Sequence, residues 1–145
     1  MEPLTSALQS VWFNLRAEHQ LLWAYHWRSK GPEYYSDHLL FQRLYEARLP
    51  EIDKLAEVMV GVAGPQAVDP DLSAKVGKEL IARAESMQGT DVSRAAALVV
   101  DTLDKIEAAN SAIGPSPFAL AINNVLAAIA DSHLEALYLL KRRMA

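Results

Sequence analysis

The chain contains no cysteine among its 145 residues. This absence excludes disulfide bonds, thiolate zinc sites and cysteine nucleophiles, and it fits a reducing compartment. Long apolar runs are also missing, since none approaches the roughly 18 residues of a membrane span. The first ten residues, MEPLTSALQS, lack the basic and apolar segments of a secretory signal. We therefore expect a cytoplasmic protein with no membrane partner.

Positive charge and chain-breaking residues are scarce. The 14 Lys and Arg residues are outnumbered by 18 Asp and Glu residues, so the net charge of −4 gives no global electrostatic case for binding nucleic acid. Only six glycines and seven prolines occur, and they are clustered, which favours long helices joined by short breaks. The length and a hydrophobic content of 51% predict one domain over residues 1–145 with a substantial core.

Apolar residues recur at helical spacing in four long stretches, and no stretch alternates as a strand would. We expect long helices over about residues 4–28, from near 33 to Gly61 or Gly64, over about 90–113, and from 117 through at least 138. A shorter helix should cover about residues 71–87. Asp69 or Asp71 should cap the short helix, Thr90 or Asp91 the third long one, and Ser116, followed by Pro117, the last. Pro50 falls inside the second helix and should kink or restart it. The pattern predicts an all-α, ferritin-like four-helix bundle with a short extra helix in its longest connection.

Four side chains form a candidate metal constellation: His26, His38, Asp53 and Glu57. Imidazole nitrogens and carboxylate oxygens are the ligand types that iron and similar metals accept. Asp53 and Glu57 are four residues apart and share one helix face. His38 precedes Asp53 by 15 residues, about 22 Å along a continuous helix, which one ion cannot bridge. If these residues form one site, two chains must build it, with the second helices antiparallel across a two-fold axis.

The segments that carry these residues resemble the Dps family of mini-ferritins. The resemblance rests on the run from Ala24 to Pro32 (AYHWRSKGP), on His38 twelve residues after His26, and on the run from Ile52 to Glu57 (IDKLAE). It implies a hollow homo-oligomer, a dodecamer of four-helix bundles. It also implies ferroxidase sites at two-fold interfaces, with His26 and His38 from one subunit and Asp53 and Glu57 from its neighbour. Family members oxidise Fe(II) with peroxide or dioxygen, store ferric iron inside the shell and protect against oxidative stress.

Two departures from the family pattern bear on the expected activity. The family commonly places another acidic ligand four residues after the second histidine, where this chain has Gln42. We therefore expect one well-formed iron position per site and leave the second iron of a di-iron site open. Many members also bind DNA, but the only basic segment here is Lys141-Arg142-Arg143 near the C-terminus, so we expect DNA binding to be weak at most.

Other candidate residues have a structural interpretation. His19 and His133 are lone helix histidines, for which a structural role is the first interpretation. His19 lies seven residues before His26 on one helix face, so a minor metal role stays open for it. Trp12 and Trp23 are expected in the bundle core. The chain contains no Glu-x-x-His, the motif of di-iron centres built within one subunit. Two alternatives to an iron-oxidising shell stay open at this point. One is a Dps-like structural or DNA-protecting assembly with a degraded metal site, and the other is a helical interaction module without metal.

Overall fold

The computed structural model describes residues 2–145, and these residues form helices and connecting loops without any strand. The four long helices are α1 (Glu2–Arg28), α2 (Tyr34–Ala63), α4 (Asp91–Ser111) and α5 (Ala119–Met144). A 3₁₀ turn, η1 (Pro65–Val68), and a shorter helix, α3 (Pro70–Ser86), lie between α2 and α4. The expected all-α bundle with an extra helix is confirmed.

The helix starts follow the capping chemistry of the sequence at two of the three expected places. The Asp69 side chain accepts a hydrogen bond from the backbone N–H of Asp71 at the start of α3. Thr90 and Ser93 form a reciprocal capping box at the start of α4. The expectation for the last helix was wrong by two residues. Ser116 accepts from the backbone N–H of Phe118 in a turn, and α5 begins only at Ala119.

Pro50 does not restart the second helix, because α2 runs without interruption from Tyr34 to Ala63. Proline removes one backbone donor from the helix interior, and packing on both sides compensates for this loss. Leu44 and Arg48 are buried before Pro50, and Leu55 is buried after it. Because α2 is continuous, His38 and Asp53 are separated by about 22 Å along its axis.

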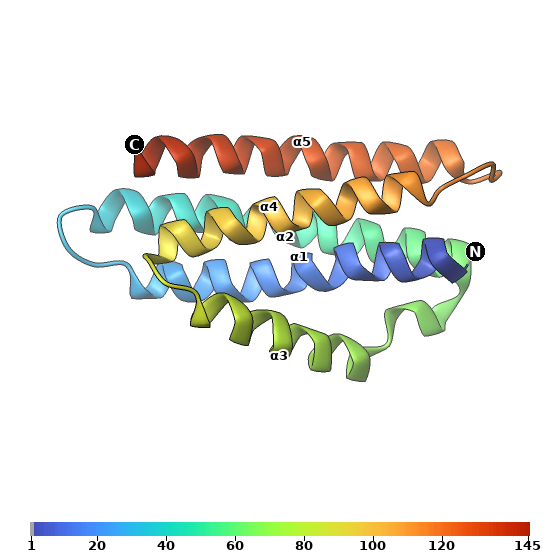
Figure 1. Ribbon diagram of the computed structural model, residues 1–145, viewed down its shortest axis with the longest axis horizontal. Helices are drawn as coiled ribbons and strands as arrows, with labels where there is room; N and C mark the ends of the chain where they lie inside the picture. The colour runs from blue at the N-terminus through green and yellow to red at the C-terminus, as the bar shows by residue number, and fades with distance from the viewer. Residues whose placement is uncertain (1) are drawn as a thin grey trace.

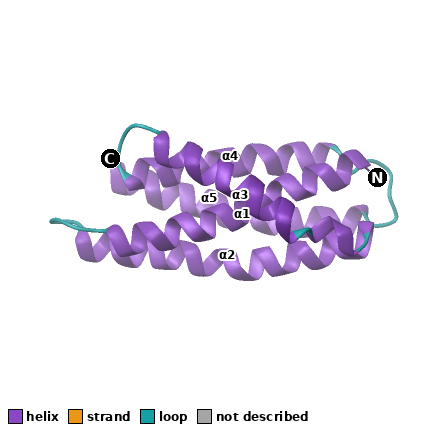
Figure 2. Ribbon diagram, turned by 90° about the horizontal axis from the view of Figure 1, so that it is seen from below, coloured by secondary structure: helices purple, strands orange, loops and turns teal. Residues whose placement is uncertain are grey.

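The chain path is that of a ferritin-like bundle (Figures 1 and 2). Helix α1 packs antiparallel against α2, and α4 packs antiparallel against α5. Helices α2 and α4 run in the same direction, so the chain must return along the length of the bundle between them. Helix α3 makes that return on the outside of α1, on the side away from α5 (Figure 1). This long crossover produces the ferritin-like connectivity.

The apolar core consists of two clusters, one toward each end of the bundle. Leu15, Leu55 and Leu126 belong to the first, and Leu22, Phe41 and Leu140 belong to the second. Burial of such side chains supplies the main driving force for packing the helices. Within residues 2–145, none of the helices combines the length and apolar character needed to cross a membrane.

Candidate metal centre

His26 and His38 lie face to face where α1 ends and α2 begins. Their ring centroids are 3.6 Å apart, and the ring planes differ by 17°. Nδ1 of His26 lies 2.7 Å from the backbone oxygen of His38, and Nδ1 of His38 lies 2.8 Å from the backbone oxygen of His26. The backbone oxygen of each histidine therefore holds the imidazole of the other, and both ring orientations are fixed.

This reciprocal arrangement sets the tautomer of both histidines. A carbonyl oxygen only accepts hydrogen bonds, so each Nδ1 must carry a proton and donate it. The lone pair of each neutral ring is then on Nε2, and no hydrogen bond joins either Nε2 to any of residues 2–145. Histidines that ligate metals commonly donate their other ring N–H to a backbone carbonyl in this way. Each neutral imidazole thus presents an Nε2 lone pair with no hydrogen-bond partner within residues 2–145.

Asp53 and Glu57 lie on the same helix as His38 but toward its other end. Both carboxylates are exposed, and neither forms a hydrogen bond or ion pair within residues 2–145. The continuous α2 places Asp53 about 22 Å along the axis from His38. The structure therefore brings His26 and His38 together and leaves Asp53 and Glu57 as a separate carboxylate pair.

No single-chain metal site is formed by these residues. Within residues 2–145, no group of three or more His, Asp or Glu side chains is arranged to hold a metal ion. The chain instead presents two incomplete sets of ligands, an imidazole pair and a carboxylate pair. Each set has the hard or borderline donors that iron accepts.

Gln42 lies one helical turn after His38 and is engaged elsewhere. Its Nε2 donates to Oε1 of Glu46 across 3.0 Å. An amide is neutral, so Gln42 offers no charge to a metal near His38. Where the family pattern has a carboxylate, this chain therefore has an uncharged side chain that is hydrogen-bonded to Glu46.

Aromatic side chains surround the imidazole pair. The Tyr34 ring stacks on His38 at 5.2 Å, and Tyr45 meets His26 edge-on at 5.4 Å. Trp23 stacks on Tyr45 and is 39% exposed, so its expected place in the core was wrong. Trp27, beside it, is 64% exposed. The two tryptophans form an exposed aromatic surface beside the candidate ligand pair.

A groove between α1 and α2 leads from this aromatic cluster toward the carboxylate pair. Its volume is about 430 Å³. His19, Leu49 and Asp53 line it, together with Trp12, Arg16, Gln20, Ile52 and Ala56. Trp12 itself is buried as expected, and its indole N–H donates to the backbone oxygen of Ile52. The groove therefore contains Asp53 of the carboxylate pair, but neither His26 nor His38 lines it.

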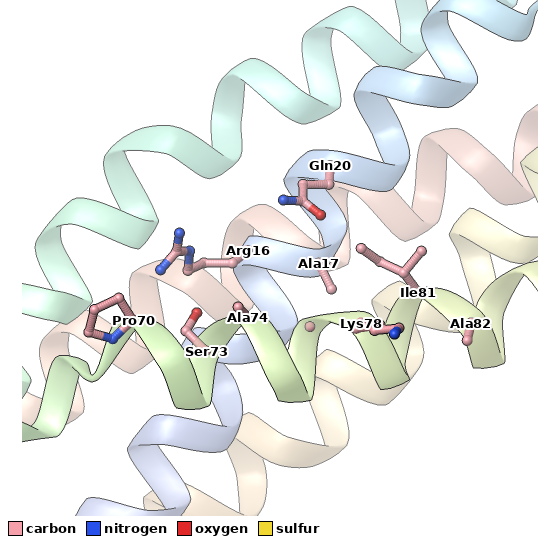
Figure 3. Close-up of a pocket in the computed structure, with 10 residues that line it drawn as sticks. Arg16, Ala17, Gln20, Pro70, Ser73, Ala74, Lys78, Ile81 and Ala82 are labelled. Carbon is pink, nitrogen blue, oxygen red and sulfur yellow. The ribbon is translucent and has the colours of Figure 1, made fainter.

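A second groove, of about 460 Å³, lies between α1 and α3 (Figure 3). Arg16 and Gln20 of α1 face Ser73, Lys78 and Ile81 of α3 across it. It contains two cationic side chains but no carboxylate or imidazole. This groove lacks ligands for a metal and contains none of the four candidate residues.

The sequence analysis missed a buried polar layer in the middle of the bundle, between the two apolar clusters. Each long helix contributes to it: Glu18 from α1, Arg48 from α2, Thr102 from α4 and His133 from α5, all at most 1% exposed. Nη1 of Arg48 donates to Oε1 of Glu18 across 3.1 Å. The Thr102 hydroxyl also donates to Glu18. Nε2 of His133 lies 2.9 Å from Oε2 of Glu18.

The layer fixes the charge of Glu18 in the folded state. Burial alone would raise the pKa of this carboxyl, but His133, Arg48 and the Thr102 hydroxyl together lower it below its usual range. Glu51 borders the layer, with Oε1 2.9 Å from Nε of Arg48 in an ion pair whose angle is too poor for a hydrogen bond. Burial raises the pKa of Glu51 despite the opposing charges of Arg48 and His133.

A signal for this layer was present in the sequence. Glu18 follows Leu15 by three residues and precedes Leu22 by four, so it occupies an apolar stripe. On its own helix, His133 follows Ile129 by four residues and precedes Leu137 by four. A charged residue on a buried stripe requires a partner on a facing helix. The layer serves the packing of the bundle, because Arg48 occupies its centre and leaves no open position for a metal.

Comparisons with known proteins identify the fold. The chain is similar to the crystal structure of Dps from Thermosynechococcus elongatus, with a TM-score of 0.77 and 21% sequence identity over 99% of this chain and 91% of that one. No protein-family model matches the chain, and a search of curated proteins also returns no match. The chain therefore has the Dps-type ferritin-like fold, and the resemblance found in the sequence is confirmed at the level of fold.

Proposed function

We propose that this protein is a Dps-like mini-ferritin, one domain over its whole length, that oxidises Fe(II) at sites shared by two subunits. The observation that carries the proposal is the reciprocal hydrogen bonding of His26 and His38, which leaves both Nε2 atoms free as ligands. Both Nε2 atoms carry a lone pair and have no hydrogen-bond partner among residues 2–145, as expected of metal ligands.

The second subunit supplies what the imidazole pair lacks. A two-fold axis that brings His38 of one chain to Asp53 of the other also brings Asp53 of the first chain to His38 of the second. Each dimer then contains two equal sites, each with two imidazoles and the two carboxylates of Asp53 and Glu57. The exposed Trp23, Trp27 and Leu49 along the same face support this contact, since a second copy would cover them.

The ligand set suits the oxidation of Fe(II). Two carboxylates neutralise the divalent ion, and their hard oxygens favour the ferric product. Each Fe(II) releases one electron, so reduction of one peroxide to water requires two Fe(II) ions. With Gln42 bound to Glu46, we propose one well-formed iron position per site and leave the second position open. Two Fe(II) ions supply one electron each, and two protons from solvent complete the conversion of one peroxide to two waters. The ferric product would be stored inside a hollow homo-oligomer, a dodecamer in Dps proteins.

Mixing two inactive variants tests the shared site directly. The variants His38→Ala and Glu57→Ala should each form the assembly but lose rapid Fe(II) oxidation. When the two are unfolded together, mixed in equal amounts and refolded, half of the dimers contain one chain of each kind. Each mixed dimer has one site with all four ligands and one that lacks two, so about one quarter of the sites are restored.

The expected result is recovery of about one quarter of the wild-type initial rate of Fe(II) oxidation, followed by ferric absorbance. Mixing His38→Ala with His26→Ala is the matched control, because both changes fall in the same ligand set and neither mixed site is complete. Recovery in neither mixture, with assemblies of normal mass, would overturn the shared site. Full activity of the single variants would remove these residues from the iron site altogether.

A further inference from the structure

His19 differs from the other three histidines of the chain. His26, His38 and His133 each have Nδ1 within 2.8 Å of a backbone oxygen. Neither ring nitrogen of His19 forms a hydrogen bond within residues 2–145. Its ring is half-buried between the Trp23 and Tyr45 rings, at 5.5 and 5.9 Å, and it lines the groove that leads to Asp53.

The position of His19 relative to the proposed two-fold axis follows from the α2 register. If His38 of each chain lies opposite Asp53 of the other, the axis crosses the two α2 helices at the level midway between these residues. That level is at Tyr45 and Glu46, which then lie opposite their own copies. The α1 residue at that level is His19, whose ring contacts Tyr45. The same antiparallel register places His26 opposite His38 and Trp12 opposite Ile52.

We propose that His19 and its copy from the second subunit form a divalent transition-metal site on the two-fold axis, distinct from the two iron sites. This inference rests on the two-chain arrangement of the proposed function. Two imidazoles across an axis are a ligand pair that Zn²⁺ and similar borderline ions accept. One ion would therefore bind per two chains, whereas the iron sites number one per chain.

Neighbouring groups suit such an ion. Burial lowers the pKa of His19, which favours the neutral imidazole that ligates metals. Glu46 lies at the same axial level on α2 and precedes Asp53 by seven residues, so it shares the face that meets the second copy. Its exposed carboxylate supplies negative charge from each chain. Arg16, the nearest cation of the groove, is held over the Trp12 ring at 4.9 Å.

A cysteine substitution tests the position of the axis. The chain has no cysteine, so His19→Cys contains a single thiol per chain. Mild oxidation should give a disulfide-linked dimer, since two residues on a two-fold axis come within the short Cα separation that a disulfide needs. Lys30→Cys is the control, because residue 30 lies beyond Arg28, the end of α1, which is itself about 14 Å along the helix from His19, so its two copies are far apart. Absence of a linked His19→Cys dimer would overturn the proposal.

Zinc binding tests the ligand role separately from iron chemistry. The background is His26→Asn, His38→Asn, Asp53→Asn and Glu57→Gln, which removes all four proposed ligands of the iron sites. Calorimetric titration with Zn²⁺ alone should give about one ion per two chains. Adding His19→Gln should weaken this binding at least tenfold, and His19→Asn serves as a second variant if the first folds poorly.

The outcomes separate the two proposals. Disulfide formation with zinc binding that ignores His19 would overturn the metal site and leave the two-chain iron site standing. Zinc at one ion per two chains that depends on His19 would support the axial site even if the mixing experiment showed no iron oxidation. Zinc at one or more ions per chain in the background variant would place the ion elsewhere and overturn the proposal.

Discussion

Arg48 and Glu18 form an ion pair in the centre of the bundle, with Nη1 of Arg48 3.1 Å from Oε1 of Glu18 and both side chains shielded from water. The pair joins α1 to α2 at the level where the two apolar clusters meet. Taking two charges out of water is costly, and their attraction repays this cost only when both are present. The layer is therefore sensitive to the loss of one partner.

Arg48→Met should lower the free energy of unfolding by about 3–5 kcal/mol, because it leaves Glu18 as a buried charge without its guanidinium. Urea denaturation measures this loss. Glu18→Gln combined with Arg48→Met should recover part of it, since the uncompensated charge is then gone. The control is Arg28→Met, which breaks the exposed ion pairs to Glu85 and Asp91 and should cost about 1 kcal/mol or less. Equal losses in the two single variants would contradict this account.

Glu51 should make the protein less stable as the pH rises. Its pKa is raised in the folded state by burial, so the folded protein holds a proton that the unfolded chain has already released. The contribution of this group is therefore fully present below the unfolded value, 4.5, and is lost as the pH rises through the raised folded pKa. Glu51→Gln should remove this dependence of stability on pH. The difference in unfolding free energy between the variant and the wild type should therefore favour the variant more at pH 7 than at pH 5. A variant whose pH profile matches the wild type would contradict the assignment.

Gln42→Glu should create the second iron position. The new carboxylate lies one turn after His38 on α2 and would add a charged ligand to the imidazole pair. Anaerobic Fe(II) titration should then rise from about one to about two ions per site. Gln42→Ala is the matched control and should keep about one. The like charge of Glu46 four residues away should cost a few tenths of a kcal/mol in stability. An unchanged stoichiometry would mean that residue 42 faces away from the metal.

Leu49→Asp should separate the two-fold dimer while the bundle stays folded. Leu49 is 51% exposed in the groove between the axial level of Tyr45 and Asp53, where a second copy would bury it. An unpaired carboxylate in that contact costs several kcal/mol, enough to dissociate a dimer. Sedimentation should show the lower mass, with unchanged helix content by circular dichroism. Leu49→Met, which keeps the apolar contact, should assemble normally.

Local chemistry accounts for the parts of the fold that were predicted correctly. Thr90 caps α4 and Asp69 caps α3, because such side chains satisfy free N–H groups over two or three residues. Ser116 and Pro117 misled the prediction for α5, since a turn closes first and the helix begins at Ala119. Trp23 was placed in the core by its spacing, yet it lies on the outer edge between α1 and α2 and is exposed.

The spacing of the four candidate ligands could be read from the sequence, but the geometry of the histidine pair could not. On a continuous α2, a site that used His38 together with Asp53 would need two chains. The mutual hydrogen bonds of the two histidines depend on how the loop from Arg28 to Tyr34 turns α2 back against α1. The spacing of apolar residues along the sequence gives no information about the direction of that turn.

The sequence by itself therefore determined the helices, the ligand types and their separation along the chain, because these depend on residues a few positions apart. Only the tertiary structure decided which helix faces meet. That choice puts Arg48 beside Glu18 and His133 and orients the imidazoles of His26 and His38 through each other's carbonyl groups. It also leaves two carboxylates, those of Asp53 and Glu57, without a partner among residues 2–145. The physical reason is that burial and hydrogen-bond pairing are satisfied between helices, and the partners lie 12 to 115 residues apart in the chain.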